Sequence, residues 1–175
     1  MPRKGVLDRA EYIAGEIVKK LSAAGKMIAA AESCTAGLAA DLIARIPGAS
    51  KVLWGSFVTY TADAKQKMLG IPEGLIYEHG AVSRPVALAM AEGALLKSSA
   101  HYAFSITGLA GPDGDGSGNP VGTVWIGFAA RDETGSPGMA GAARKEAIEF
   151  CFKGSRNEVR EAAAIAALKE ILERI

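Results

Sequence analysis

The sequence predicts an α/β fold with a mixed, mostly parallel sheet, and three observations carry that prediction. First, 49% of the 175 residues are hydrophobic and 22% are charged, which is typical of a globular domain with a buried core. Second, short apolar runs of strand length alternate with longer segments whose apolar residues recur at helical spacing. Third, the early runs are joined through helices, which favours parallel strands, and the late runs follow one another through loops, which favours antiparallel pairing.

The predicted helices begin or end at residues with a recognised local role. Gly25 stops the first helix, Pro47-Gly48 ends the second, and Thr61 and Ser83 can cap the third and fourth. Pro85 falls in the first turn of the fourth helix, where its missing N–H does little harm. The helices are expected over residues 7–21, 35–46, 61–69, 84–98 and 157–175. Because no repeat or linker divides the chain, we expect a single domain over residues 1–175.

Polar residues follow three of the predicted strands at the point where each strand ends. Ser33, Tyr60 and Thr107 each lie at or just beyond such an end. Parallel strands place their carboxyl ends on one edge of a sheet, and ligands of open α/β sheets bind outside that edge. The topology therefore predicts that these three residues share one crevice. The strands are expected over residues 27–31, 52–60, 102–108, 121–131 and 142–152.

Charge and composition exclude several classes of function. The formal net charge of +1 gives no broad field to attract nucleic acid or an anionic membrane, and no apolar run is long enough to span a bilayer. Two cysteines, Cys34 and Cys151, without a secretory signal, favour free thiols in a reducing cytoplasm. Two histidines are too few for a His-based metal cluster. We expect a cytoplasmic protein with no nucleic-acid partner, membrane anchor or metal.

Residues 31–37 read Ala-Glu-Ser-Cys-Thr-Ala-Gly and lie where a strand gives way to a helix. A serine there can attack a carbonyl, and the N–H groups that open the helix can receive the resulting oxyanion. Alternatively, Ser33 or Thr35 merely caps the helix. These seven residues leave both interpretations open.

A serine nucleophile needs a base, and Lys65 is one candidate. It lies in the first turn or so of a predicted helix, where the helix dipole disfavours a cation, and partial burial would lower its pKa further. Tyr60 could relay the proton or orient the amine. The alternative is a solvated lysine beside an aromatic residue that fills the edge of the core.

Other nucleophilic arrangements are possible from the residues alone. A Ser-His-Asp arrangement would have to use His79 or His101, although nothing fixes either beside Ser33. Cys34 could act as the nucleophile with a histidine partner, but a cysteine in such a turn more often points into the core.

The glycine-rich loop over residues 107–120 matches no nucleotide or metal motif. It lacks the Gly-Lys-Ser/Thr ending of a phosphate loop, contains no G-x-G-x-x-G, and is followed by a strand. Asp113 and Asp115 have the spacing of a calcium loop, but Val124 stands at its twelfth position. The loop is either a plain surface connection or a cover for the crevice, with N–H groups that an anion can approach closely.

Six blocks of the sequence resemble the CinA C-terminal domain, the family of the nicotinamide-nucleotide amidohydrolases. They occur in order and with plausible spacing, from the first strand towards the final helix. The blocks are Ala31–Thr35, Pro47–Ser50, Phe57–Tyr60 with Lys65, His79–Ser83, Thr107–Pro112 and Pro120–Val124. Together they are specific, although each is weak alone.

The resemblance implies a three-layer α/β/α domain with a mixed sheet, for which we expect five to six strands. It also implies hydrolysis of the amide of nicotinamide mononucleotide to nicotinic acid mononucleotide and ammonia, with no cofactor. The implied catalytic residues are Ser33, Lys65 and Tyr60. The expected substrate-binding residues are Cys34, Thr35, Gly37, Thr107, Gly108, Gly111 and Arg156. The N–H groups near Cys34 and Thr35 would hold the oxyanion, and Arg156 or Arg144 the phosphate.

The chain departs from the family pattern at three positions. Ala36 stands where the family usually has a second glycine, and its methyl could narrow the pocket. Ser155 replaces an aspartate that could orient Arg156, and Asn119 replaces a common lysine. The amino-terminal domain of longer relatives is also lacking, so any pyrophosphatase activity of that domain is expected to be absent.

Two rival functions stay open from sequence. The departures favour a catalytically weak paralogue that binds a nucleotide or a partner protein. The family's older name suggests a DNA-associated competence or damage factor. The near-neutral net charge of the chain argues against DNA binding. The apolar helices make a homo-oligomer a reasonable expectation. The sequence does not choose between the nucleotide, the riboside and free nicotinamide as substrate.

Overall fold

A five-stranded sheet in the order β2-β1-β3-β4-β5 forms the centre of the computed structural model, which describes residues 4–131 and 144–175. β1 pairs in parallel with β2 and with β3, whereas β4 is antiparallel to both of its neighbours. Four strands therefore run one way and β4 runs against them, which confirms the predicted mixed sheet. The strands are β1 (Ile28–Glu32), β2 (Leu53–Val58), β3 (Tyr102–Gly108), β4 (Thr123–Ala130) and β5 (Arg144–Cys151).

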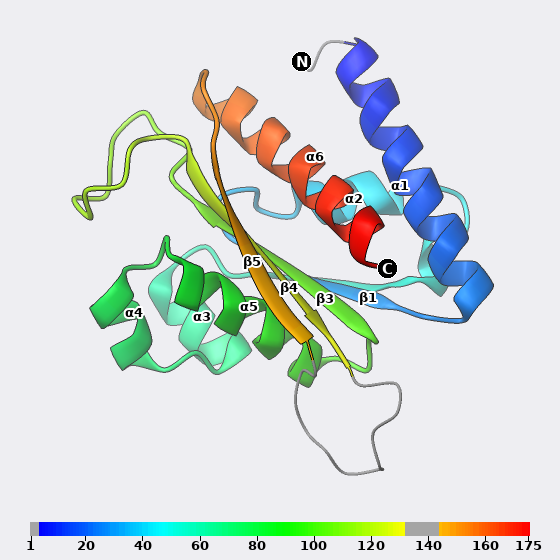
Figure 1. The fold of residues 1–175 in the computed structure, drawn as a ribbon, viewed down its shortest axis with the longest axis horizontal. Coiled ribbons are helices and arrows are strands. Elements are labelled where there is room, and N and C mark those ends of the chain that lie inside the picture. The colour runs from blue at the N-terminus through cyan, green and yellow to red at the C-terminus, as the bar shows by residue number, and fades with distance from the viewer. Residues whose placement is uncertain (1–3, 132–143) are drawn as a thin grey trace.

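Helices cover both faces of the sheet. α1, α2 and α6 lie on one face, and α3, α4 and α5 lie on the other (Figure 1). This arrangement confirms the three-layer α/β/α architecture. The helices are α1 (Lys4–Ala24), α2 (Leu38–Ala44), α3 (Ala62–Leu69), α4 (Glu73–His79), α5 (Arg84–Lys97) and α6 (Arg156–Arg174), with a short 3-10 turn, η1 (Ala49–Lys51). Among the described residues, none of these helices combines the length and apolar character needed to cross a membrane.

Alternate residues of the central strands serve two separate cores. Ile28 and Ala30 of β1 pack with the α1, α2 and α6 side, and Ala29 and Ala31 pack with the α5 side. All five residues of β1 are buried, as expected for a parallel strand covered on both faces. The small alanine side chains let both helix layers approach the strand that carries the candidate nucleophile at its end.

Two predictions of secondary structure differ from the structure, and a third lies outside the described residues. The helix expected over residues 35–46 begins only at Leu38, because Ala36 and Gly37 adopt positive φ angles of 52° and 95°. α4 was not predicted, since none of its residues is buried and it has no apolar periodicity to reveal it. The connection between the strands expected over 121–131 and 142–152, and the first two residues of the latter, lie outside the described residues.

The carboxyl ends of β1, β2 and β3 meet at one edge of the sheet. Glu32 is in register with Val58 of β2 and with Ile106 of β3. Beyond these ends, the Ser33 N–H donates to the Ile106 carbonyl at 2.9 Å, and the Thr59 N–H donates to the Glu32 carbonyl at 2.8 Å. Ser33 is thereby fixed beside the segment that follows β2.

Replacing Ala36 with glycine is expected to stabilise the fold, because alanine at φ 52° carries a steric penalty that glycine avoids. We expect a gain of up to about 1 kcal/mol in the free energy of unfolding, measured by urea denaturation. The control is Ala162→Gly in the middle of α6, which should lose about 1 kcal/mol. Equal losses in both variants would contradict the strain at Ala36.

Candidate active site

Ser33 and Lys65 are brought together at the carboxyl edge of the sheet. Lys65 Nζ lies 2.9 Å from Ser33 Oγ, although the residues are 32 positions apart. The same Nζ lies 2.9 Å from the carbonyl oxygen of Thr59. Thr61 caps α3 by accepting a hydrogen bond from the Ala64 N–H, which starts the helix one turn before Lys65. The cap therefore sets the position from which the lysine reaches back to the serine.

Burial brings the pKa of the lysine down towards neutral pH. The Lys65 side chain is 1% exposed, and in the described part of the chain no carboxylate forms an ion pair with it. Desolvation lowers the pKa of Lys65 from 10.5 to about 8, and the Cys34 thiol opposes this only in part. A neutral amine in this place can donate one N–H to the Thr59 carbonyl and accept the hydroxyl proton of Ser33. The pair thus has the geometry of a nucleophile and its base.

A buried carboxylate, Glu32, occupies the N-terminus of α2. Its two side-chain oxygens accept hydrogen bonds from the N–H groups of Gly37, Ala39 and Ala40 at 2.9 to 3.1 Å. The N–H groups that open this helix are therefore not available to an oxyanion. Sequence reasoning missed this role of Glu32; the available signal was an acidic residue at the end of an apolar strand, just before a helix.

The turn between β1 and α2 leaves two backbone donors open. Within the residues that the structure describes, no other residue accepts a hydrogen bond from the N–H groups of Cys34 or Thr35. Their carbonyl oxygens, in contrast, accept from the Arg160 guanidinium. Arg160 was also missed from sequence, because its partners are backbone atoms that carry no sequence signature. The turn itself therefore offers donors for an oxyanion directly after Ser33 in the chain.

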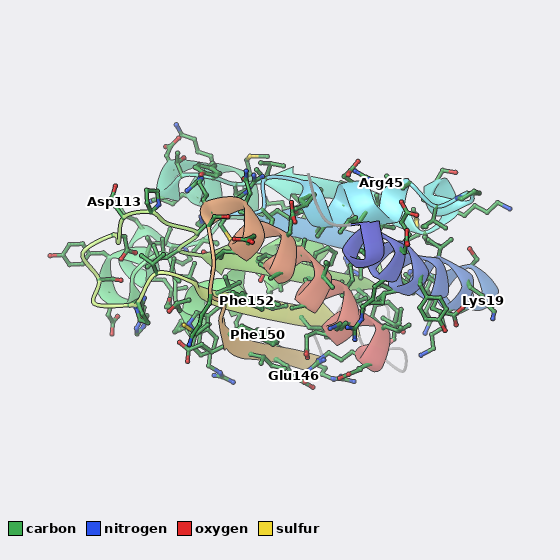
Figure 2. All side chains as sticks on the ribbon, turned by 90° about the horizontal axis from the view of Figure 1, so that it is seen from above. Lys19, Arg45, Asp113, Glu146, Phe150 and Phe152 are labelled. Atoms are coloured by element: carbon green, nitrogen blue, oxygen red, sulfur yellow. The ribbon has the colours of Figure 1, made fainter. Side chains whose placement is uncertain are left out.

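A cavity of about 190 Å³ opens next to Ser33. Its walls come from the β1–α2 turn, from the end of β2, from the glycine-rich loop after β3 and from the start of α6. The lining residues are Ser33, Cys34, Tyr60, Gly108, Leu109, Ala110, Gly111, Asp113 and Arg156. Figure 2 shows Asp113 on that loop, at the end of the molecule opposite Lys19. The glycine-rich loop is therefore part of the cavity wall, as one of the two sequence interpretations expected.

Arg156 lies across this cavity. One guanidinium nitrogen donates to the Gly111 carbonyl at 2.6 Å, and another donates to the Tyr60 hydroxyl. Among the hydrogen bonds of the described residues, the Tyr60 hydroxyl makes none with Ser33 or Lys65. The contact expected for a proton relay through Tyr60 is thus absent from the described hydrogen bonds, whereas a contact that orients Arg156 is present.

The three departures from the family pattern have local explanations. Ala36 is exposed and does not line the cavity, so its methyl does not narrow it. Ser155 forms a capping box with Glu158 at the start of α6, and Arg156 is oriented by Tyr60 and Gly111 without a carboxylate. The Asn119 side chain donates to the Val82 carbonyl at 3.0 Å, which ties the glycine-rich loop to the segment before α5.

Several expected ligand contacts lie outside the cavity. Thr35, Gly37 and Thr107 do not line it, and the Thr107 hydroxyl donates to the Ala81 carbonyl at 2.8 Å. The suggestion that Arg144 binds the phosphate is wrong. Arg144 begins β5 at the end of the sheet away from the cavity, where its Nε lies 2.7 Å from Glu146 Oε1.

The alternative nucleophiles and metal sites gain no support. His101 lies at the start of β3, at the opposite edge from Ser33, and accepts a hydrogen bond from the Met27 N–H. Burial raises the pKa of Cys34 to about 11, so its thiol is protonated and a poor nucleophile. In the loop, Asp115 accepts hydrogen bonds from Ser117. Among the described residues no group of three or more potential metal ligands gathers.

Comparison with known proteins agrees with this architecture. The family model for the CinA C-terminal domain matches residues 10–175. The nicotinamide-nucleotide amidohydrolase PncC of Escherichia coli strain K12 is 44% identical over 157 residues, which cover 89% of this chain and 88% of that protein. A CinA-like protein of Anaeromyxobacter is 42% identical over 87% of this chain, but the match spans only 35% of that longer protein.

Solved structures share the fold over almost the whole chain. The competence/damage inducible protein CihA from Agrobacterium tumefaciens aligns with a TM-score of 0.85 and 38% identity, covering 94% of each chain. A CinA superfamily protein from Escherichia coli aligns with a TM-score of 0.86 and 29% identity, over 95% of this chain and 90% of that one. With a family model that spans all but the first nine residues, the chain belongs to the CinA C-terminal domain family.

Proposed function

We propose that this protein hydrolyses the carboxamide of nicotinamide mononucleotide to give nicotinic acid mononucleotide and ammonia. The observation that carries the proposal is the 2.9 Å contact between Ser33 Oγ and a buried Lys65 amine beside an open cavity. The name of the Escherichia coli relative, which aligns over nearly all of both chains, supports the substrate. Release of ammonia from this nucleotide by the purified protein is the direct test.

The first step is attack by Ser33 Oγ on the carboxamide carbon. Lys65 accepts the hydroxyl proton as the new C–O bond forms, and negative charge develops on the amide oxygen. The donors at the start of α2 are already bound by Glu32. The N–H group of Cys34, which lines the cavity, is assigned to the amide oxygen together with that of Thr35, the next residue of the turn, whose side chain lies behind the cavity wall. Such donors act most strongly where water is excluded.

The second step breaks the C–N bond. The Lys65 ammonium returns its proton to the amine nitrogen, ammonia leaves, and the nicotinoyl group stays on Ser33 as an ester. Water then attacks the ester while Lys65 takes a proton, and Ser33 is regenerated as the acid product leaves. The Thr59 carbonyl keeps the amine in place through both steps by accepting one of its N–H groups.

Charges on the cavity wall suit a nucleotide substrate. Nicotinamide attached to ribose is a pyridinium cation, and the 5′-phosphate is an anion. Asp113 and Arg156 supply the two complementary charges on the lining, and we assign the phosphate to Arg156. Tyr60 is assigned to holding this guanidinium, since its hydroxyl accepts from Arg156.

Replacing Ser33 with alanine should abolish hydrolysis without unfolding the protein. We expect kcat to fall by at least about 10³-fold, as for other serine hydrolases that lose the nucleophile, measured by ammonia release. The matched control is Cys34→Ser, which removes the neighbouring thiol and should keep kcat within about tenfold of the starting protein. Near-full activity in Ser33→Ala would reject the serine mechanism.

The pH dependence of kcat/KM should report the buried lysine. With a pKa of about 8 for Lys65, the basic form is a minority at neutral pH, so kcat/KM should rise with pH and level off above about 8. Lys65→Arg, which stays protonated throughout, should lose activity at every pH. A rate that falls as pH rises from 6 to about 8 would contradict Lys65 as the base.

The same lowered pKa predicts how stability depends on pH. The folded protein holds Lys65 with a pKa near 8 and the unfolded chain near 10.5, so the unfolded state binds more protons between these values. Stability should therefore rise with pH in this window. Relative to Lys65→Met, the free energy of unfolding of the parent protein should increase by about 2 to 3 kcal/mol from pH 7 to about 10. Parallel urea titrations of both proteins measure the difference, and a constant difference would refute the shift.

A further inference from the structure

We propose that Arg160 is a positioning residue that holds the β1–α2 turn in the conformation in which the N–H groups of Cys34 and Thr35 face the oxyanion, and that it orients the Thr35 N–H directly through the Cys34 carbonyl. The inference rests on the proposed function, because it assigns those N–H groups to the reacting amide oxygen. Arg160 does not line the cavity, and it acts through the backbone of the turn that carries Ser33.

The Arg160 guanidinium binds two consecutive carbonyl groups. Its Nε donates to the Cys34 carbonyl at 2.9 Å, and one Nη donates to the Thr35 carbonyl at 3.1 Å. The other Nη donates to Asn157 Oδ1 at 3.2 Å, one turn earlier in α6. The planar, always charged guanidinium holds its donors in a rigid fork, so it fixes both the position and the rotation of the peptide groups it binds.

Peptide geometry converts this contact into an orientation of N–H groups. In a trans peptide, the carbonyl of one residue and the N–H of the next point in opposite directions. Because the Cys34 carbonyl faces Arg160, the Thr35 N–H points away from it. Because the Ser33 carbonyl accepts from the Ala36 N–H at 3.0 Å, the Cys34 N–H points away from the inside of the turn. Both donors are therefore fixed by contacts made on the other side of their peptide groups.

The unsatisfied polar groups of Thr35 are an independent indication that this turn binds a ligand. Thr35 is fully buried, yet its side-chain oxygen has no hydrogen-bond partner, and no other residue in the described ranges accepts from its N–H. Buried polar groups without partners are rare and destabilising, and here the two such side-chain oxygens among the described residues, those of Thr35 and Thr59, belong to the segments directly after β1 and β2, on either side of the Ser33–Lys65 pair. A developing oxyanion would give this N–H the acceptor that the protein does not supply.

Glu32 restrains the same turn from its other end. Its carboxylate takes the N–H groups of Gly37, Ala39 and Ala40, and thereby anchors the start of α2. The turn is thus held by a carboxylate that binds its later N–H groups and by a guanidinium that binds its earlier carbonyls. Over residues 4–131 and 144–175, the two N–H groups between these restraints donate to no other residue.

Kinetics of Arg160→Met and Arg160→Lys, with nicotinamide mononucleotide as substrate, test the role. We expect kcat of Arg160→Met to fall by about 10- to 100-fold while KM stays within about twofold, because the lost support acts mainly in the transition state. Arg160→Lys can reach one carbonyl and should lose less. The control is Arg174→Met, which removes an arginine of the same helix bound to Glu146 and Glu170 and should leave kcat unchanged. Thermal unfolding of all variants checks the fold.

A second readout separates this inference from the choice of substrate. A fluorophosphonate phosphonylates an active serine. The bond between the serine oxygen and phosphorus forms, the P–F bond breaks, fluoride leaves and the base takes the serine proton. Its phosphoryl oxygen needs the same N–H support, so the rate of Ser33 labelling, followed by mass spectrometry, should fall in Arg160→Met as kcat does. If the parent protein labels but releases no ammonia, the proposed function fails while the labelling rates still test Arg160.

Either measurement can overturn the proposal. A folded Arg160→Met protein with the kcat and labelling rate of the parent would show that the guanidinium does not aim the donors. A loss of kcat no larger than in Arg174→Met, or one matched by a rise in KM, would indicate a purely structural role. If Arg160→Met does not fold, Arg160→Lys decides: a lowered kcat at constant KM supports the proposal, and an unchanged kcat rejects it.

Discussion

The rest of the site depends on the burial of the Lys65 amine away from water. Lys65 is buried, no carboxylate of the described residues forms an ion pair with it, and this burial opposes its positive charge. The fold makes the burial tolerable by placing a carbonyl and a hydroxyl within 2.9 Å of Nζ. A carboxylate in the same place would stabilise the protonated form of Lys65, which cannot accept the Ser33 proton. The proposed serine–lysine chemistry thus requires that no carboxylate forms a salt bridge with Lys65.

The second requirement is a rigid backbone beside the nucleophile. The fold meets it by fixing the β1–α2 turn through Glu32 on one side and Arg160 on the other, with Ala36 in a left-handed conformation between them. The helix dipole of α2, which often serves anion binding, is here taken up by the protein's own carboxylate. The cavity wall beside Ser33 is consequently formed by the β1–α2 turn, the glycine-rich loop, the end of β2 and the start of α6, and the N-terminus of α2 takes no part in it.

The sequence allowed prediction of site contacts between side chains better than of contacts to backbone groups. Ser33 and Lys65 could be placed together because parallel strands end at one edge, a rule that follows from the order of the elements. The role of Arg160 could not be predicted, since it acts on backbone carbonyl groups that every residue carries, and for Glu32 the only signal was an acidic residue between an apolar strand and a helix. The late start of α2 was missed for a related reason: alanine gives no sign that it will adopt a positive φ.

Cys34 sits directly beside the hydroxyl that we assign as nucleophile, and burial keeps its thiol protonated. Peroxides and alkylating agents react with the thiolate, so this sulfur is slow to be oxidised or capped. The Cys34 thiol can therefore line the cavity without acting as a redox-sensitive group. The proposed chemistry uses a hydroxyl and an amine, so it does not require this thiol to ionise.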